Sequence, residues 1–229
     1  MLNVKSLHAA YGQSEVLHGI DLAVPAGEIV AIMGRNGMGK TTLMKTLMGI
    51  VPEKSGEITV GDQLVTGLKS HSRVAKGIGY VPQGRMIFSS MTVQENVETG
   101  LTVTGNKTVP DDIYEMFPVL LEMKNRRGGN LSGGQQQQLA IARALASNPK
   151  VLLLDEPTEG IQPSIIREMA RTLRKIRDEK QLSIIVSEQV LSFALDVADR
   201  VVVIENGTFV HDSPRDGIDE AKVSKFLSV

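Results

Sequence analysis

The sequence Gly34-Arg35-Asn36-Gly37-Met38-Gly39-Lys40-Thr41-Thr42 decides the fold of this chain. It fits the pattern G-x-x-x-x-G-K-[ST], follows an apolar run over residues 28–33 and precedes a helical pattern over residues 43–48. In this context the glycines let successive backbone N–H groups point at phosphate oxygens, and the positive end of the helix adds to the same site. We therefore predict that the loop binds the phosphates of a nucleotide.

Two side chains at the end of this loop have predicted roles of their own. Lys40 would reach the β- and γ-phosphates, and Thr41 would place its hydroxyl on Mg²⁺. A glycine-rich turn with a surface lysine is the alternative, but the eight-position pattern and its flanks both fit a phosphate loop.

The composition indicates one α/β domain, or one domain with an inserted sub-domain. The chain has 229 residues, of which 41% are hydrophobic, enough to bury a sizeable core. Its 25 basic and 26 acidic residues nearly cancel, so no overall basic field favours a nucleic-acid partner. The absence of cysteine from the sequence excludes disulfides, thiolate metal sites and cysteine nucleophiles.

The apolar runs are too short to cross a membrane. The longest, such as residues 151–154 and 201–204, have the length of a buried strand, whereas a span needs about 20 residues. The first residues, 1–5, lack the apolar core of a secretory signal. We therefore expect the chain not to cross a membrane by itself and to be cytoplasmic.

Short apolar runs separated by helical segments indicate the sheet. Alternation over residues 2–22, broken at residues 10–13, predicts two antiparallel strands joined by a turn. Aliphatic runs at residues 151–154, 183–187 and 200–205, spaced by helices, predict a parallel sheet covered on both faces.

Residues 89–146 differ from the rest because their periodicity is helical. We therefore expect a single α/β domain with a P-loop nucleotide-hydrolase core, a parallel sheet, an N-terminal antiparallel β subdomain and an inserted α-helical subdomain. The core would comprise residues 1–88 and 147–229, and the helical subdomain residues 89–146.

Two adjacent carboxylates, Asp155 and Glu156, follow the apolar run of residues 151–154. Because successive strand side chains point to opposite faces, the two can serve different tasks. Asp155 can face Mg²⁺, directly or through water, while Glu156 meets the attacking water. A strand end with solvated acids is the alternative, which the phosphate loop in the same chain makes much weaker.

A second candidate phosphate site lies directly before the helical run of residues 139–145. Ser132 followed by two glycines at a helix start is an anion-binding arrangement of backbone donors, or else an ordinary N-cap with flexible glycines. With the phosphate loop and the acidic pair, the sequence Leu131-Ser132-Gly133-Gly134-Gln135 resembles the signature of ATP-binding cassette (ABC) ATPases, and the resemblance covers the whole chain.

The resemblance implies a head-to-tail dimer of ATPase subunits. Each ATP would lie between the phosphate loop of one subunit and the signature of the other, and Lys40, Glu156 and Gln189 would be the catalytic residues, with Glu156 as general base. The residues expected to bind the nucleotide are Tyr11, Gly34, Arg35, Asn36, Gly37, Met38, Gly39, Lys40, Thr41, Thr42, Gln83, Ser132, Gly133, Gly134 and Gln135. Those expected to hold Mg²⁺ are Thr41, Gln83 and Asp155.

Four positions carry particular implications of this resemblance. Tyr11 matches the aromatic residue that stacks on adenine, and Gln83 the glutamine that touches Mg²⁺ and senses the membrane subunit. Gln162 stands where the family usually has an aspartate. Gln189 stands where it has a switch histidine; its amide can still hydrogen-bond a γ-phosphate oxygen, but it cannot become a cation near neutral pH.

The two positions that differ from the usual family pattern, Gln162 and Gln189, indicate one branch of the family. Residues 81–88, 155–166 and the pair Glu188-Gln189 are similar to the ATPase subunits of importers for branched-chain amino acids, amides and urea. Within this branch, residues 34–40 with Met33 before them, and residues 158–164, look most like the smaller ATPase of urea importers. We expect a peripheral ATPase at the cytoplasmic face of the membrane, energising import of urea or, alternatively, of branched-chain amino acids.

The implied partners are a second ATPase subunit, forming a homo- or heterodimer, membrane permease subunits and, indirectly, a periplasmic or lipid-anchored solute-binding protein. The loop over residues 83–91 is expected to contact the permease through Met86, Ile87, Phe88 and Met91. Alternatively, Ile87 and Phe88 pack into the helical insertion.

Two rival functions remain. A soluble ABC ATPase acting in assembly or repair is disfavoured by the compact insertion, without long coiled-coil arms or zinc cysteines. A P-loop kinase leaves residues 131–135 unexplained.

Overall fold

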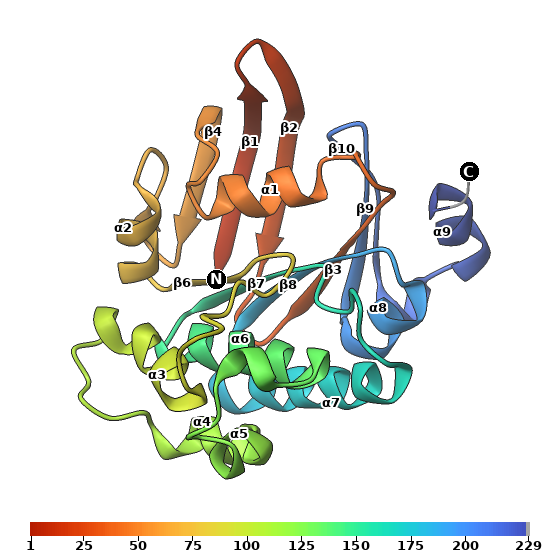
Figure 1. Cartoon of the computed structure of the whole chain (residues 1–229). Helices are drawn as coiled ribbons and strands as arrows, with labels where there is room; N and C mark the ends of the chain where they lie inside the picture. The colour runs from red at the N-terminus through yellow and green to blue at the C-terminus, as the bar shows by residue number, and fades with distance from the viewer. Residues whose placement is uncertain (228–229) are drawn as a thin grey trace.

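The computed structural model describes residues 1–227 and contains two sheets with a helix between them (Figure 1). The strands are β1 (Leu2–Tyr11), β2 (Ser14–Val24), β3 (Ile29–Met33), β4 (Glu53–Val60), β5 (Gln63–Leu64), β6 (Ile78–Val81), β7 (Val151–Asp155), β8 (Ser183–Glu188), β9 (Arg200–Glu205) and β10 (Thr208–Pro214). The helices are α1 (Lys40–Leu47), α2 (Ser70–Ala75), α3 (Val93–Glu98), α4 (Asp111–Met116), α5 (Pro118–Glu122), α6 (Gly133–Ala146), α7 (Pro163–Lys180), α8 (Leu191–Val197) and α9 (Glu220–Leu227), with short 3-10 turns η1 (Thr99–Val103), η2 (Gly128–Asn130) and η3 (Arg215–Gly217).

The larger sheet confirms the predicted parallel core. Its strand order is β10-β9-β3-β8-β7-β6, and β9, β3, β8, β7 and β6 pair in parallel. The smaller sheet has the order β2-β1-β4-β5 and pairs antiparallel throughout, as the alternation over residues 2–22 predicts for β1 and β2. The fold class expected from the sequence is therefore confirmed.

One strand of the larger sheet, β10, runs antiparallel and is not predicted by the sequence analysis. It follows β9 after a two-residue turn, Asn206-Gly207, whose φ angles are 46° and 74°. Two residues with positive φ form the tight turn of a hairpin, and a hairpin joins only antiparallel strands. Gly207 is also required by space, because a Cβ there would lie 1.8 Å from the Val16 carbonyl oxygen.

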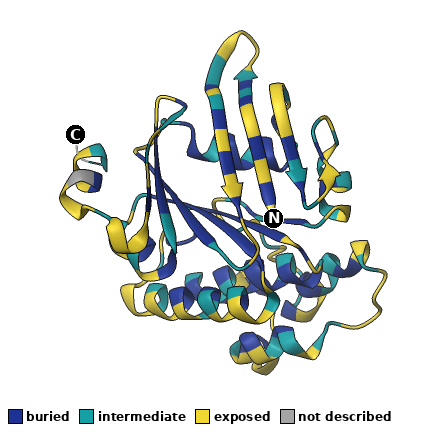
Figure 2. Cartoon of the chain, turned by 180° about the vertical axis from the view of Figure 1, so that it is seen from behind, coloured by how far each residue is buried: buried dark blue, intermediate teal, exposed yellow. Residues whose placement is uncertain are grey.

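The larger sheet lies between two hydrophobic cores, so its strands are buried on both faces. In β3, Ala31 and Met33 join one core, while Val30 and Ile32 join the other. The first core packs against α3 to α8, and the second contains α1 and the inner face of the smaller sheet. Figure 2 shows the same pattern as nearly continuous burial along the strands of the larger sheet.

Residues 89–146 contain α3 to α6 and no strand of either sheet, in keeping with the predicted helical character. In Figure 1, α6 and α7 lie beneath the larger sheet, on the face opposite α1. Among the described residues, 1–227, no helix combines the length and apolar character needed to cross a membrane. Because β3, β7 and β8 are parallel, their carboxyl ends meet at one edge, where ligands commonly bind in such sheets.

Candidate active site

The phosphate loop connects β3 to α1. Gly37 and Gly39 have φ angles of 82° and 110°, a backbone conformation that side chains with a Cβ rarely adopt. Gly34 has a different reason for lacking a side chain, because a Cβ there would lie 2.6 Å from the carbonyl oxygen of Ile204 in β9. The loop is thus held closely against the sheet.

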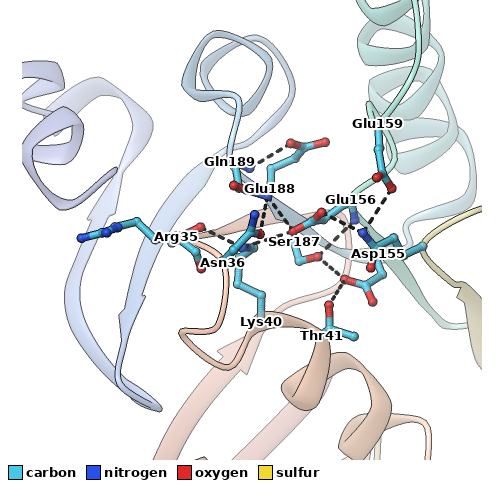
Figure 3. Close-up of polar contacts among 12 residues, drawn as sticks. Arg35, Asn36, Lys40, Thr41, Asp155, Glu156, Glu159, Ser187, Glu188 and Gln189 are labelled. Carbon is cyan, nitrogen blue, oxygen red and sulfur yellow. Dashed lines mark hydrogen bonds and ion pairs between the residues drawn. The ribbon is translucent and has the colours of Figure 1, made fainter. Parts of the chain in front are cut away.

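Lys40 is the first residue of α1, and only 4% of it is exposed. Its Nζ donates to the carbonyl oxygens of Gly34, at 2.8 Å, and Arg35, at 3.1 Å, and lies 3.2 Å from Oε1 of Glu156 (Figure 3). The ammonium group is therefore held at the centre of the loop, between backbone acceptors and the carboxylate at the end of β7.

Asp155, the last residue of β7, is 1% exposed. Its Oδ1 accepts hydrogen bonds from Ser187 Oγ at 2.5 Å and Thr41 Oγ1 at 3.2 Å, and its Oδ2 from the hydroxyl of Tyr80 at 3.4 Å. Burial raises the pKa of the Asp155 carboxyl, whereas the hydrogen bonds from Ser187 and Thr41 act in the opposite direction. A bound cation would favour its ionised form.

The oxygens of Thr41 and Asp155 fit Mg²⁺ chemically. Mg²⁺ prefers oxygen ligands, and in nucleotide sites it takes one or two carboxylates together with phosphates and water. Among the described residues, no group of three or more His, Cys, Asp or Glu side chains could hold a metal ion alone. A metal at this position would therefore depend on the nucleotide for its remaining ligands.

Glu156 has a left-handed backbone, with φ at 46°, and its backbone N–H donates to the carbonyl oxygen of Ser187 at 3.1 Å. Besides Lys40, its carboxylate accepts from the side-chain amides of Gln83, at 3.3 Å, and Gln189, at 3.0 Å. The adjoining cavity, of about 300 Å³, is lined by Asn36, Gly37, Gly39, Lys40, Thr41, Thr42, Gln83 and Glu156. Most of the predicted phosphate loop, Gln83 and the predicted base thus share one cavity.

Gln189 follows β8 and joins the phosphate loop to Glu156. Its Nε2 donates to Asn36 Oδ1 at 2.8 Å as well as to Glu156 Oε1 (Figure 3). Gln189 and Glu156 also line a second cavity, of about 450 Å³, which shares Asn36 and Gln83 with the first. The neutral amide therefore reaches both a neutral acceptor, on Asn36, and a carboxylate, on Glu156.

The signature residues lie at the start of α6 and do not line the phosphate-loop cavity. Ser132 and Gln135 form a capping box: Ser132 Oγ accepts from the Gln135 N–H at 3.3 Å, and Gln135 Oε1 from the Ser132 N–H at 3.0 Å. A Cβ on Gly134 would lie 2.7 Å from Ile165 Cγ2 in α7, whereas Gly133 is close to the guanidinium of Arg85. Close packing against α7 therefore explains why position 134 is a glycine.

The remaining predicted residues lie outside this cavity. Tyr11 ends β1, and 51% of it is exposed at the turn before β2. Met38 lies against the β9–β10 turn, with its carbonyl oxygen accepting from the Gly207 N–H at 3.0 Å. Gln162 is the N-cap residue of α7 but makes no side-chain cap.

The loop expected to expose four apolar side chains exposes two of them. Met86 and Phe88 are 69% and 48% exposed, whereas Ile87 is partly buried against the first core and Met91 is half-buried. For Ile87 the alternative therefore fits better, because its side chain packs against the core that includes the helical insertion, whereas Phe88 is exposed as expected. Arg143 of α6 supports the exposed ring, with its guanidinium carbon 5.3 Å from the centroid of Phe88.

Four polar residues that contact the site were not predicted: Tyr80, Ser187, Glu188 and Thr158. Ser187 and Glu188 are fully buried at the end of β8. Glu188 Oε1 accepts from the backbone N–H of Thr158 at 3.0 Å and from its hydroxyl at 2.6 Å. The only signal in the sequence is that two polar residues end an otherwise aliphatic run, and nothing in it identifies partners about 30 residues away.

Comparison with known proteins identifies the family. A model described as ABC transporter matches residues 17–159. The chain belongs to this family. It is an ABC transporter ATPase, the energising subunit of a transporter.

Several relatives of this ABC ATPase are named for amino-acid transport. It is 41% identical over 217 residues to the high-affinity branched-chain amino acid transport ATP-binding protein BraG of Pseudomonas aeruginosa, covering 93% of each chain. It is 34% identical over 210 residues to a probable branched-chain amino acid transport ATP-binding protein of Archaeoglobus fulgidus, covering 90% of this chain and 89% of that one. Neither is named for urea, so these relatives favour the amino-acid alternative over the urea prediction.

Solved cassettes share the fold of this ABC ATPase. One ATP-binding cassette of an ABC transporter superimposes with a TM-score of 0.86 at 23% identity, covering 100% of this chain and 99% of that one, which bears on the fold alone. A bacterial ABC transporter cassette described as dimeric gives a TM-score of 0.83 at 25% identity, covering 95% of this chain and all of the other.

Proposed function

We propose that this chain energises the import of branched-chain amino acids by binding and hydrolysing ATP at the cytoplasmic face of a membrane. Its similarity to BraG, 41% over nearly the whole of both chains, carries this proposal. Urea import is the second candidate, and it rests only on the sequence likeness over residues 33–40 and 158–164.

In the proposed reaction, water attacks the γ-phosphorus of ATP, and Glu156 accepts the proton that the water loses as ADP leaves. Lys40 and the backbone N–H groups of residues 34–42 hold the phosphates. Thr41, Asp155 and Gln83 would hold Mg²⁺, which when bound neutralises charge on the β- and γ-phosphates. Gln189 would position Glu156 relative to the γ-phosphate, and Tyr11 would stack on adenine.

The signature residues would act in a second subunit. Because Ser132, Gly133, Gly134 and Gln135 lie outside the cavity of their own chain, we propose that they bind ATP held by the phosphate loop of a partner ATPase, identical or related. The dimeric cassette among the structural neighbours supports this arrangement. Residues 89–146 would form a helical subdomain that carries the signature toward the partner, with residues 1–88 and 147–229 as the nucleotide-binding core.

We further propose that permease subunits, supplied with solute by a binding protein, dock beside the Gln83 loop. An apolar groove of about 540 Å³ lies between α2 and α6 and includes Met86, Phe88 and Val103. Exposed apolar patches of this kind mark binding surfaces. The Arg143 guanidinium both underlies Phe88 and donates to the carbonyl oxygen of Arg85 at 3.2 Å, so the groove is connected to the loop that begins at Gln83.

Substitution of Phe88 by glutamate is expected to uncouple transport from ATP hydrolysis. The charge would oppose docking of an apolar permease segment, while the catalytic cavity, which Phe88 does not line, would be unchanged. Basal ATPase activity of the isolated subunit and solute uptake by the assembled transporter are the two measurements. Leu121→Glu is the matched control, because Leu121 is 49% exposed on α5 and lies outside the groove. Equal uptake by the Phe88 and Leu121 variants would exclude this docking site.

Transport itself tests the proposed solute. The transporter is reconstituted in vesicles from this subunit, its partner ATPase, the permease and the binding protein, with ATP supplied on the side of the membrane where the ATPase subunits lie. These vesicles should accumulate radiolabelled leucine, isoleucine or valine. Vesicles with Lys40→Ala should not, which separates transport from leakage. Accumulation of urea without any of the three amino acids would replace the proposed solute by the second candidate.

A further inference from the structure

Glu188, the last residue of β8, is a buried acid to which the proposed reaction assigns no task. Only 2% of it is exposed. Its Oε1 accepts from the backbone N–H and the hydroxyl of Thr158, and its Oε2 from the backbone N–H groups of Gln189, at 2.9 Å, and Val190, at 3.3 Å. One side chain therefore joins two segments that are about 30 residues apart in the sequence.

Both segments carry residues of the proposed reaction. Thr158 lies two residues after Glu156, and its loop continues to Glu159, which accepts a hydrogen bond from Gln83 at 3.2 Å. The turn at the end of β8 carries Gln189, whose amide reaches Glu156 and the phosphate loop. Glu188 therefore holds the backbone of this turn and also binds the loop that follows Glu156. Figure 3 shows Glu188 beside Gln189.

The contacts of Glu188 exclude a direct chemical role. A carboxylate has about four lone-pair positions, and four donors from the protein occupy them. Among the lysine and arginine side chains that the structure describes, none forms an ion pair with it. Glu188 thus has no acceptor to spare for water or metal, and three of its four contacts are backbone N–H groups, the fourth being the Thr158 hydroxyl.

We propose that Glu188 is a positioning residue that locks the loop after Glu156 to the turn bearing Gln189, so that the carboxylate and the amide are aligned together on the attacking water. This inference rests on the roles proposed above for Glu156 and Gln189. A neutral amide at position 188 would keep the size of the side chain but replace one acceptor by a donor that faces other donors.

Glu188→Gln is therefore expected to lower kcat for ATP hydrolysis about 10-fold, with the affinity for a non-hydrolysed ATP analogue changed by less than about 3-fold. The full-length chain is used, with its partner ATPase if hydrolysis requires one. Glu179→Gln is the matched control, because Glu179 is an exposed acid of α7 whose ion pair with Lys175 spans 3.7 Å. A structural defect alone would lower the folded fraction and leave kcat per active site unchanged, so active sites are counted by analogue binding.

A double-mutant cycle with Gln189→Ala separates positioning from independent effects. Gln189→Ala alone should lower kcat about 3- to 10-fold, because it removes the two side-chain hydrogen bonds to Asn36 and Glu156. If Glu188 acts through Gln189, adding Glu188→Gln to the Gln189→Ala variant should lower kcat by less than a further factor of about 3. Multiplication of the two losses, or an unchanged kcat in Glu188→Gln, would overturn the proposal.

If Glu188→Gln does not fold, Thr158→Val tests the positioning role of Glu188 instead. It removes only the hydroxyl donor at 2.6 Å and leaves the other three contacts of Glu188 in place. A loss in kcat of about 3-fold in the wild-type background, with no loss in the Gln189→Ala background, supports the positioning role of Glu188. An unchanged kcat in the wild-type background contradicts it. Wild-type hydrolysis by Glu156→Gln would instead refute the proposed base, whatever the variants at position 188 do.

Discussion

Replacement of Glu156 by glutamine is expected to slow ATP hydrolysis about 10²- to 10⁴-fold while leaving ATP bound. Glutamine keeps the size and hydrogen-bonding reach of the side chain but cannot accept the proton of the attacking water, and loss of a general base typically has an effect of this size. Binding should survive, because Lys40 and the backbone donors of the phosphate loop remain. The variant should therefore accumulate in the ATP-bound state.

Two measurements check this prediction together. Single-turnover hydrolysis gives the rate, and size-exclusion chromatography with ATP and Mg²⁺ tests whether the trapped state is a dimer, of this chain alone or with its partner ATPase. Glu179→Gln serves as the control, since Glu179 is an exposed acid of α7 and lies outside both cavities. Hydrolysis at the wild-type rate would place the base elsewhere, and an ATP-bound monomer in the presence of the partner would refute the shared site.

Replacement of Lys40 by alanine is expected to abolish turnover and to weaken ATP binding as well. The Nζ of Lys40 would balance charge on the β- and γ-phosphates both before and during the reaction, so its loss affects affinity and rate together. This combination distinguishes it from Glu156→Gln, which should affect the rate alone. Equilibrium binding of a labelled ATP analogue and steady-state phosphate release are the measurements.

The Lys40 variant needs a test of folding, because Nζ also satisfies the carbonyl oxygens of Gly34 and Arg35. Circular dichroism and the unfolding midpoint would report any disruption of the loop. Lys45→Ala is the matched control, since Lys45 lies on the same helix, α1, near its last turn and outside the cavity. Near-normal hydrolysis by a folded Lys40→Ala protein would remove the assignment of residues 34–42 as the phosphate loop.

The sequence predicts those parts of the site whose partners are local. Gly37, Gly39 and Lys40 lie within one loop, and their chemistry follows from their spacing. Asp155 and Glu156 are recognisable because a strand of aliphatic residues ends in two acids. The side of the sheet on which they meet also follows, since parallel strands place their carboxyl ends together.

The parts that the sequence does not predict depend on pairings between distant segments. Ser187 is recognisable as a partner of Asp155 only when β7 and β8 are known to be neighbours, and Glu188 requires the position of Thr158 as well. The reason for Gly134 is of the same kind, because it is set by Ile165 of α7. By contrast, the antiparallel strand β10 has a local signal in the sequence, because Asn206-Gly207 is a favoured two-residue turn of a β-hairpin.

The left-handed backbone of Glu156 has a consequence for the thermostability of the enzyme. A residue with a Cβ gives up about 1–2 kcal/mol of folding free energy in that conformation, which glycine adopts freely and asparagine tolerates. Engineering for heat resistance alone would therefore select against glutamate at this position. A screen that scores only the melting temperature would favour variants that had lost the proposed base, so selection for stability here has to include a measure of ATP turnover.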